Sequence, residues 1–401
     1  MTDEAPAEGI PADVLIGIAC AVVAVLASLV ACLASQDGRF SPTALVKLSS
    51  TEPLAAVARA TDPHFVLVHP VEHYDGVYYY AIARDPFMNG REHTLIDQPA
   101  YRYGHPFYGW LARVVALGRD SAIPMAMLLL SLVGAGVAAF ALSRLAFGYG
   151  RSPWAGLLVA ASPGLLYAVT VSTTEMVAAA LLLLTVLAWT RARIVAAGVL
   201  LVALCLTKET YVVVAAGLFL WEAVQWWRSR ARPDRVWVRA AALVAGPAAL
   251  LGWQAIVHAR LGSWPGTGAP GNVARPLAGW WHTFSFAHLL SSGSYDQSEM
   301  GAIVGPVLIA LAVVLLAAAG FALRLRTPLD GVLLGLVVVM STLNYLTLAY
   351  PHELIRNPSV ALLVALSVLL IRPRPLARQI LSEGLPRVRS DEPTSQDRQW
   401  E

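Results

Sequence analysis

One short segment near the start of the chain, HYDGVYYYAIARDPF (73–87), concentrates residues that can do chemistry in a sequence otherwise rich in Ala, Leu and Val. A carboxylate such as Asp75 can take a proton from a hydroxyl group, or it can cap the first turn of a helix. After Asp75, apolar and aromatic residues recur at helical spacing. They predict a short amphipathic helix over residues 76–84, lying at a membrane boundary. Asp75 then stands at the N-terminus of this helix, and Gly76 allows a close approach. The two roles of Asp75 are compatible.

A second stretch, LIDQPAYRYGHPFYGWLARVVALG (95–118), also mixes aromatic rings with polar groups. Aromatic platforms beside hydrogen-bonding groups suit a carbohydrate, whereas a membrane anchor has less need of Asp97, Arg102 and His105. Residues 104–118 predict another interfacial helix. The candidate substrate-binding residues of the chain are Tyr74, Tyr78, Tyr79, Tyr101, His105, Glu209 and Glu353.

Two short polar turns between apolar runs carry further charges. In LTKETY (206–211), Lys208 lies next to an acid at a membrane edge, where charge is costly and usually paired or functional. A solvated turn with a snorkelling lysine is the alternative. In YPHELIRNP (350–358), Glu353 and Arg356 are three residues apart and can pair on one helical face. Arg356 can instead bind phosphate, because its planar fork matches phosphate oxygens.

Metal and cofactor motifs are sparse. The sequence contains no HExxH, no CxxC, no DxD pair and no P-loop. Glu72, His73 and Asp75 are close enough in sequence for a divalent cation, but no second cluster of ligands accompanies them. We therefore expect no metal site and no cofactor. The three cysteines fall within apolar runs, which indicates small buried side chains.

The elements that must position these residues are membrane spans. Of 401 residues, 57% are hydrophobic and only 14% are charged, where a soluble domain has about a quarter charged. Long apolar runs predict an all-α polytopic membrane protein with about ten transmembrane helices. The first run is too long, and its flank too acidic, for a cleavable signal peptide. The predicted spans lie near residues 14–34, 122–143, 153–170, 174–190, 193–207, 210–227, 236–258, 300–323, 329–349 and 358–371.

Arginine predicts the orientation of these spans. The loops after the even-numbered spans and the C-terminal tail are basic: RLAFGYGR, RAR, RSRARPDRVWVR, RLR and RPRPLAR. The short loops of the other set carry only Lys208 and Arg356. The positive-inside rule then places both termini in the cytoplasm, in a bacterial inner (plasma) membrane. We expect a membrane domain over residues 1–371, with 35–121 as a large extracytoplasmic loop, and a mostly disordered cytoplasmic tail over 372–401.

With Asp75 on the outer face after the first span, the pattern resembles the GT-C superfamily of membrane glycosyltransferases. YDGVYYYAIARDPF, with PAYRYGHPFYGWLA downstream, is similar to the W/Y-D-x-x-x-Y-x-x-I-A segment of bacterial mannosyltransferase-like members and to the phosphatidylinositol-glycan mannosyltransferases. The resemblance is best over residues 70–115 and covers the rest as a pattern of spans. A single aspartate stands here where many relatives have an acidic pair.

The resemblance implies transfer of mannose, or of another hexose or a pentose, from a polyprenyl-phosphate donor to a lipid or glycan acceptor. It implies that Asp75 is the catalytic acid of the first loop, acting as general base in an inverting reaction. Cationic side chains would stabilise the leaving phosphate. The candidates for this role are Arg356, Lys208, Arg102 and His352, with Arg356 first.

Other classes of function compete with transfer. A secondary transporter, or a flippase or scaffold for lipid-linked sugars, is compatible with about ten spans and charges at span edges. Against a transporter, the sequence has no convincing duplicated half, and its polar residues gather at one predicted face. The sequence lacks the basic stripe interleaved with aromatic residues that would indicate nucleic-acid binding. Arginine in the predicted cytoplasmic loops accounts for the net charge of +3.

Overall fold

The structure is a computed structural model that describes residues 10–371 except 37, 231–233, 268–270 and 292–297. Over these residues the chain is helical, and the only β-pairings are two isolated bridges, Ser49 with Val68 and Val273 with Leu343. The predicted all-α class is therefore confirmed. The predicted tail over residues 372–401 lies outside the described part of the chain.

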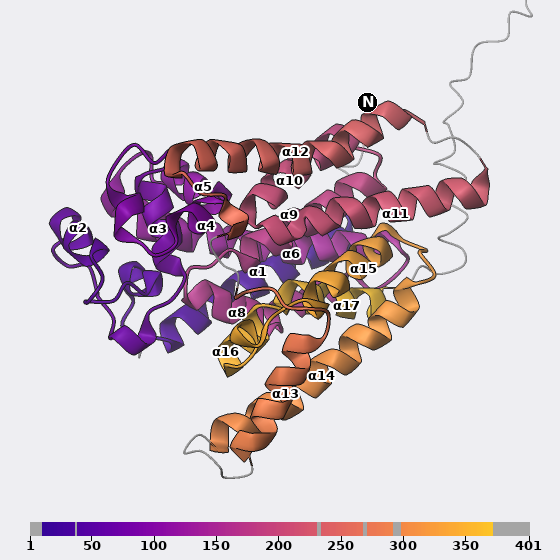
Figure 1. Cartoon of the computed structure of the whole chain (residues 1–401). Coiled ribbons are helices and arrows are strands. Elements are labelled where there is room, and N and C mark those ends of the chain that lie inside the picture. Colours follow the sequence, from indigo (N-terminus) through magenta and orange to yellow (C-terminus); the bar gives the residue numbers. More distant parts are fainter. Residues whose placement is uncertain (1–9, 37, 231–233, 268–270, 292–297, 372–401) are drawn as a thin grey trace, which may run out of the picture.

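Long helices form a bundle, and a group of short helices gathers at one end of it (Figure 1). The short helices come from the segment between α1 and α6. They are α2 (Leu54–Thr61), α3 (Gly76–Arg84), α4 (Pro99–Tyr103) and α5 (Phe107–Val115). The segment predicted as one long loop thus has structure of its own, as loops of this length usually do.

The remaining helices build the bundle and its connections. They are α1 (Ala12–Ala34), α6 (Ile123–Gly148), α7 (Leu157–Ala160), α8 (Pro163–Thr170), α9 (Glu175–Thr190), α10 (Ile194–Thr207), α11 (Val212–Ser229), α12 (Val236–Leu261), α13 (Ala278–Ser291), α14 (Ser298–Ala322), α15 (Pro328–Ser341), α16 (Pro351–Arg356) and α17 (Ser359–Leu370). The most extensive contacts pair α1 with α6, α10 with α12, and α11 with α15. Most of the core is a single cluster of apolar side chains that runs through the bundle and the short helices.

Four helices in the described residues are long and apolar enough to cross a bilayer: Ala12–Ala34, Asp120–Gly148, Val236–Leu261 and Ala302–Ala322. A fifth crossing results if Pro153–Ala160 and Pro163–Thr170, which meet at a bend of 51°, form one broken span. The protein is therefore a helical membrane protein, as predicted. The count of ten spans, the kind of membrane and the orientation stay predictions.

Helix α1 shows how the bundle meets lipid. Its buried face consists of small residues: Gly17, Cys20, Ala24, Ser28 and Cys32. Its exposed face carries large branched side chains: Leu15, Ile18, Val22, Leu26 and Val30. In a membrane, helices approach through small residues, while large apolar side chains face the lipid tails. This inside-out pattern is typical of a helix at the lipid boundary.

The predicted helix over residues 76–84 is confirmed as α3, but its predicted amphipathic character is wrong. Every residue from Gly76 to Ala83 is buried, because α3 packs against α5, α6 and the short turns at Pro42–Val46 and Glu92–Leu95. Its tyrosines therefore belong to the core of the outer segment instead of an interfacial belt. In the second predicted interfacial segment, Val114 of α5 and Leu117, two residues after its end, are exposed. The interfacial position of this helix stays a prediction.

Candidate functional site

The site is built around Asp75, which stands directly before α3. The backbone here lies unusually close to its neighbours: a Cβ on Gly76 would come 2.6 Å from the carbonyl oxygen of Val171 and 2.7 Å from that of Val46. A glycine is needed for this approach, as predicted, since any side chain would collide with main-chain atoms. The Asp75 side chain makes no capping hydrogen bond to α3. The carboxylate is therefore free to act elsewhere.

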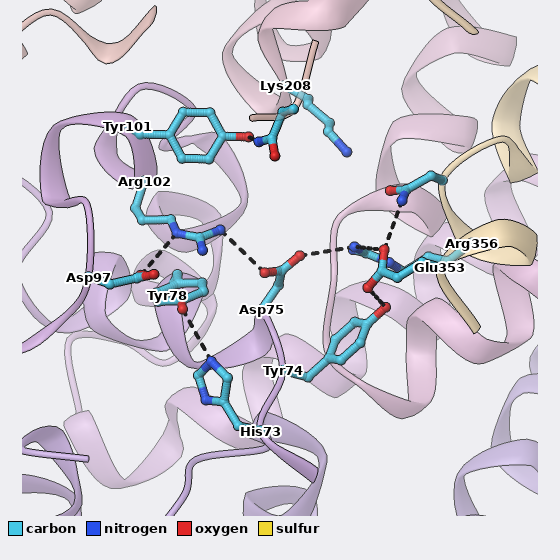
Figure 2. A network of polar contacts seen from close by, with 12 residues as sticks. His73, Tyr74, Asp75, Tyr78, Asp97, Tyr101, Arg102, Lys208, Glu353 and Arg356 are labelled. Carbon is cyan, nitrogen blue, oxygen red and sulfur yellow. Dashed lines mark hydrogen bonds and ion pairs between the residues drawn. The ribbon is translucent and has the colours of Figure 1, made fainter. Parts of the chain in front are cut away.

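Two arginines from distant parts of the chain hold this carboxylate. Nη1 of Arg102 lies 3.3 Å from Oδ1 of Asp75, and Nη2 of Arg356 donates to Oδ2 at 3.0 Å (Figure 2). The Asp75 side chain is nonetheless 32% exposed, so a small molecule can still contact it. Burial alone raises the pKa of Asp75, but the two arginines and Lys208 outweigh this effect and lower the pKa to about 2. Asp75 is thus ionised across the physiological range.

Arg356 is the centre of a larger network. Its guanidinium is buried and contacts three carboxylates: Asp75, Glu175 at 3.1 Å and Glu353 at 2.9 Å. Burial favours loss of its proton, but the three carboxylates raise the pKa of Arg356 well above its ordinary value. The predicted pairing of Glu353 with Arg356 on one helical turn is confirmed.

The backbone beside Arg356 is also held tightly. Helix α16 lies against α8 at Gly164, where a Cβ would come 1.9 Å from the carbonyl oxygen of Ile355. This oxygen belongs to the residue before Arg356, so the contact with α8 holds the backbone from which the guanidinium extends. Close backbone approaches therefore occur both beside Asp75, at Gly76, and beside Arg356, at Gly164.

Glu175 belongs to the site although it was not among the predicted site residues. It is the first residue of α9, it is almost completely buried, and Nζ of Lys208 lies 3.7 Å from its Oε1. A buried acid of this kind needs a cationic partner. The signal in the sequence was an acid placed directly before an apolar run, in the turn VSTTE.

Glu353 links the network to Tyr74, the neighbour of Asp75. The Tyr74 hydroxyl donates to Oε1 of Glu353, while Oε2 accepts from Arg356 and from Asn357 at 2.8 Å (Figure 2). The guanidinium of Arg356 also lies over the Tyr74 ring, 4.8 Å from its centroid. Both predicted residues, Tyr74 and Glu353, therefore lie next to Asp75.

Arg102 is positioned on the other side of Asp75. Its guanidinium stacks on Tyr78, 3.5 Å from the ring centroid, and its Nε donates to Asp97 at 3.3 Å. The Tyr78 hydroxyl lies 3.2 Å from Nε2 of His73, whose Nδ1 lies 3.0 Å from Glu52. Glu52 is the main reason that the pKa of His73 is raised.

Four predicted residues form a second group behind this network. Nδ1 of His105 lies 3.0 Å from Oε2 of Glu209, and the Tyr101 ring packs edge-on against His105 at 5.2 Å. The Tyr101 hydroxyl accepts from Asn272 at 3.0 Å. His105 and Tyr79 are buried, so they pack behind the network instead of facing an incoming molecule. Burial raises the pKa of Glu209, but His105 and Lys208 together lower it to about 2.

The charges of the site are mixed, with an excess of acids. Five carboxylates (Asp75, Asp97, Glu175, Glu209 and Glu353) face three cationic side chains (Arg102, Lys208 and Arg356). An anionic ligand must therefore displace a carboxylate from one of the cations. Asp97 is the partner most easily displaced, because its side chain is 54% exposed.

Within the described residues, no group of three or more His, Cys, Asp or Glu side chains is arranged to hold a metal ion. The expectation that the protein uses no metal stays a prediction.

Neither a protein-family model nor a curated protein matches this sequence. The resemblance to GT-C glycosyltransferases therefore rests on the residues around Asp75 and remains a prediction.

Proposed function

We propose that the protein is a membrane glycosyltransferase, which moves a sugar from a polyprenyl-phosphate donor to a hydroxyl group of a lipid or glycan acceptor. The observation that carries the proposal is the state of Asp75: an ionised, partly exposed carboxylate held between two arginines at one end of the bundle. Such an arrangement supplies a proton acceptor and cations at the same place. Both are needed for attack by a hydroxyl with departure of a phosphate.

In this proposal the membrane domain has ten spans with both termini in the cytoplasm. The four long helices and the bent pair α7–α8 account for five spans, and α11 adds one. The shorter apolar helices α9, α10, α15 and α17 supply four more. The basic loops then lie inside and the site lies on the extracytoplasmic face. This is the arrangement expected of a GT-C enzyme that uses lipid-linked sugar.

The reaction is a single displacement. The acceptor oxygen forms a bond to the anomeric carbon while its proton passes to Asp75, and the bond from the anomeric carbon to the phosphate oxygen breaks. The products are the glycosylated acceptor with inverted anomeric configuration and polyprenyl phosphate, and the proton leaves Asp75 for water. Arg356, Arg102 and Lys208 keep the carboxylate ionised before the acceptor arrives, because they lower its pKa to about 2.

We assign the donor phosphate to Arg102 and Lys208. The sequence favours Arg356 for this role, but three carboxylates already surround its buried guanidinium. Arg102 has an exposed partner that a phosphate can replace. Lys208 is partly exposed, and the carboxylate with which it forms an ion pair, that of Glu175, lies 3.7 Å away. In this proposal Arg356 positions Asp75. A phosphate that draws Arg102 away from Asp75 also raises the pKa of Asp75 and makes it a stronger base.

A transporter or flippase of lipid-linked sugars is the second candidate. The observation in its favour is the ion network of Glu175, Lys208 and Arg356 at the ends of apolar helices. Buried charges of this kind also mark substrate and ion paths in transporters. A transporter would move its solute without breaking a glycosidic bond.

The test compares wild-type protein with Asp75→Asn in lipid vesicles, using radiolabelled polyprenyl-phosphate sugars and a membrane-glycan extract as the source of acceptors. We expect wild-type transfer to fall by about a thousandfold in Asp75→Asn, with donor binding retained. The matched control is Asp62→Asn, which changes a surface acid whose side chain accepts from the His64 backbone in the same segment. Equal transfer by Asp75→Asn removes Asp75 from the chemistry. Absence of transfer with every donor, together with solute uptake, favours the transporter.

A further inference from the structure

Four aromatic rings meet beside the network, and together we call them the aromatic cluster: Tyr74, Tyr167, Tyr350 and His352. The Tyr74 ring lies 5.7 Å from Tyr167 and 5.7 Å from His352, measured between centroids. The His352 ring lies 5.9 Å from Tyr167 and is stacked on Tyr350 at 5.7 Å. The rings come from three separate parts of the chain: α8, the segment before α3, and α16 with its preceding residue.

The aromatic cluster is not part of the closed core. Tyr350 is 50% exposed, and the other three rings are partly exposed. By contrast, the edge-on pair of Tyr79 and Tyr108 is buried. Arg356 covers part of the Tyr74 ring, and the exposed parts of the aromatic cluster, above all Tyr350, are available to a ligand.

His352 adds hydrogen-bonding capacity to these faces. Its imidazole nitrogens make no hydrogen bond or ion pair with another described residue, and its contacts are ring contacts. Burial lowers the pKa of His352, so the ring is neutral at pH 7. A neutral imidazole offers one donor and one acceptor, which is the combination that a hydroxyl group needs.

The aromatic cluster is joined directly to the proposed proton acceptor. Tyr74 is the neighbour of Asp75 in the chain, and its hydroxyl donates to Glu353. Figure 2 shows Tyr74 and Arg356 on one side of Asp75 and Arg102 on the other. If the donor phosphate is bound on the Arg102 side, a molecule on the aromatic cluster approaches Asp75 from the opposite side. A displacement with inversion requires the acceptor oxygen and the departing phosphate oxygen to lie on opposite faces of the anomeric carbon, and separate acceptor and phosphate sites are compatible with this.

A sugar ring has C–H groups on its faces and hydroxyl groups around its rim. Aromatic faces cover the former, and unpaired polar groups beside them bind the latter. We propose that the aromatic cluster binds the sugar ring of the acceptor and holds its hydroxyl group towards Asp75. This inference rests on the proposed function. It makes the acceptor a glycan or glycolipid whose terminal residue is a sugar, and it assigns roles to Tyr167 and Tyr350.

The test changes Tyr350, because it is the most exposed ring of the aromatic cluster. With a saturating radiolabelled polyprenyl-phosphate donor and octyl α-mannoside as acceptor, we expect Tyr350→Ala to raise the acceptor KM about tenfold. We expect the donor KM and kcat to remain close to wild type, and Tyr350→Phe to retain the wild-type acceptor KM, since stacking needs the ring and not the hydroxyl. The matched control is Phe87→Ala, an aromatic side chain 54% exposed that packs on Trp110 and Trp253.

A binding measurement separates this inference from the proposed function. Saturation-transfer NMR with octyl α-mannoside reports contact with a sugar whether or not transfer occurs. A signal that is present in wild type and lost in Tyr350→Ala supports a sugar site, even if every donor fails in the transfer assay. Transfer by wild type with an unchanged acceptor KM in Tyr350→Ala overturns the inference. A loss of thermal stability alone also overturns it, because it identifies the rings as an interfacial anchor.

Discussion

Asp75 and Arg356 are 281 positions apart in the sequence, and Nη2 of Arg356 donates a hydrogen bond to Oδ2 of Asp75 at 3.0 Å. This contact joins the segment before α3 to the end of α16. The same guanidinium reaches Glu175 at the start of α9, so one buried side chain connects three parts of the chain. The position of Asp75 therefore depends on the packing of the whole bundle.

We predict that Arg356→Gln destabilises the protein by about 3–5 kcal/mol, because it leaves three carboxylates without their shared cation. Arg356→Lys keeps the charge but loses the planar fork, so the stability of this variant should lie between those of Arg356→Gln and wild type. The measurement is thermal unfolding in detergent at a fixed scan rate. Arg59→Gln, on the exposed side of α2, is the matched control and should leave the unfolding temperature unchanged. A transition unchanged in Arg356→Gln would contradict the central role of this network.

The acid limb of the pH profile should respond to Arg102. In wild type the folded pKa of Asp75 is about 2, below the ordinary value of about 3.9. The contribution of Asp75 to stability is therefore present above about pH 3.9 and is lost as the pH falls through about 2. Arg102→Gln removes one of the cations that lower this pKa, so the pKa of Asp75 should rise towards its ordinary value.

The measurement is the pH dependence of kcat/KM between pH 2.5 and 7, in vesicles that remain intact over this range. With a pKa of about 2, Asp75 should give wild type little of an acid limb in this range, whereas the limb of Arg102→Gln should enter it. Arg91→Gln, an exposed arginine of the same segment, is the control. The same profile in both proteins, without an acid limb in this range for Arg102→Gln, would show that Arg102 does not act on the group that titrates.

Gly76→Ala should displace Asp75. The added methyl group would lie 2.6 Å and 2.7 Å from two carbonyl oxygens, closer than a Cβ can come to main-chain atoms. We expect a loss of about 1–3 kcal/mol in stability and a larger loss of transfer, because the carboxylate moves away from both arginines. Gly148→Ala is the control, since a Cβ there meets nothing within 4 Å. Wild-type transfer by Gly76→Ala would show that the close approach is not needed for the site.

Glu52→Gln should lower the pKa of His73. Glu52 accepts a hydrogen bond from the charged imidazole, and Asp75 and Asp97 add smaller favourable interactions. Because the folded pKa is raised, the stability that this pair contributes is present below about pH 6.5 and is lost as the pH rises through the folded value. The measurement is an NMR titration of histidine labelled in its imidazole ring. The resonance of His64, which is exposed, serves as the internal control. A His73 pKa that Glu52→Gln leaves unchanged would contradict the assignment of this pair.

Much of the local structure could be predicted from the sequence. The apolar runs predict a helical membrane protein because the bilayer core requires about twenty apolar residues in each span. The close approach at Gly76 is confirmed too, although its partners, Val46 and Val171, are distant in the sequence. The helix over residues 76–84 and the pairing of Glu353 with Arg356 follow from local spacing, and the structure confirms both. These features depend on neighbours within one or two turns of the chain.

The surroundings of α3 could not be predicted in this way. Its sequence has the composition of an interfacial helix, yet α5, α6 and the adjacent turns cover it on every side. Nothing near Glu175 in the sequence marks it as the partner of Arg356. Tyr167 and Tyr350 are isolated tyrosines in the chain, and they join Tyr74 and His352 when α8 packs against α16.

The sequence by itself determined the class of the protein and the segment that carries Asp75, because hydropathy and helical spacing act over short distances along the chain. Only the tertiary structure decided which cations hold the carboxylate and which carboxylates occupy Arg356. Pairings across 27 and 281 positions depend on how helices pack, and helices pack through contacts between residues that have no local relationship. Two close backbone approaches, at Gly76 and Gly164, bring these residues to one place.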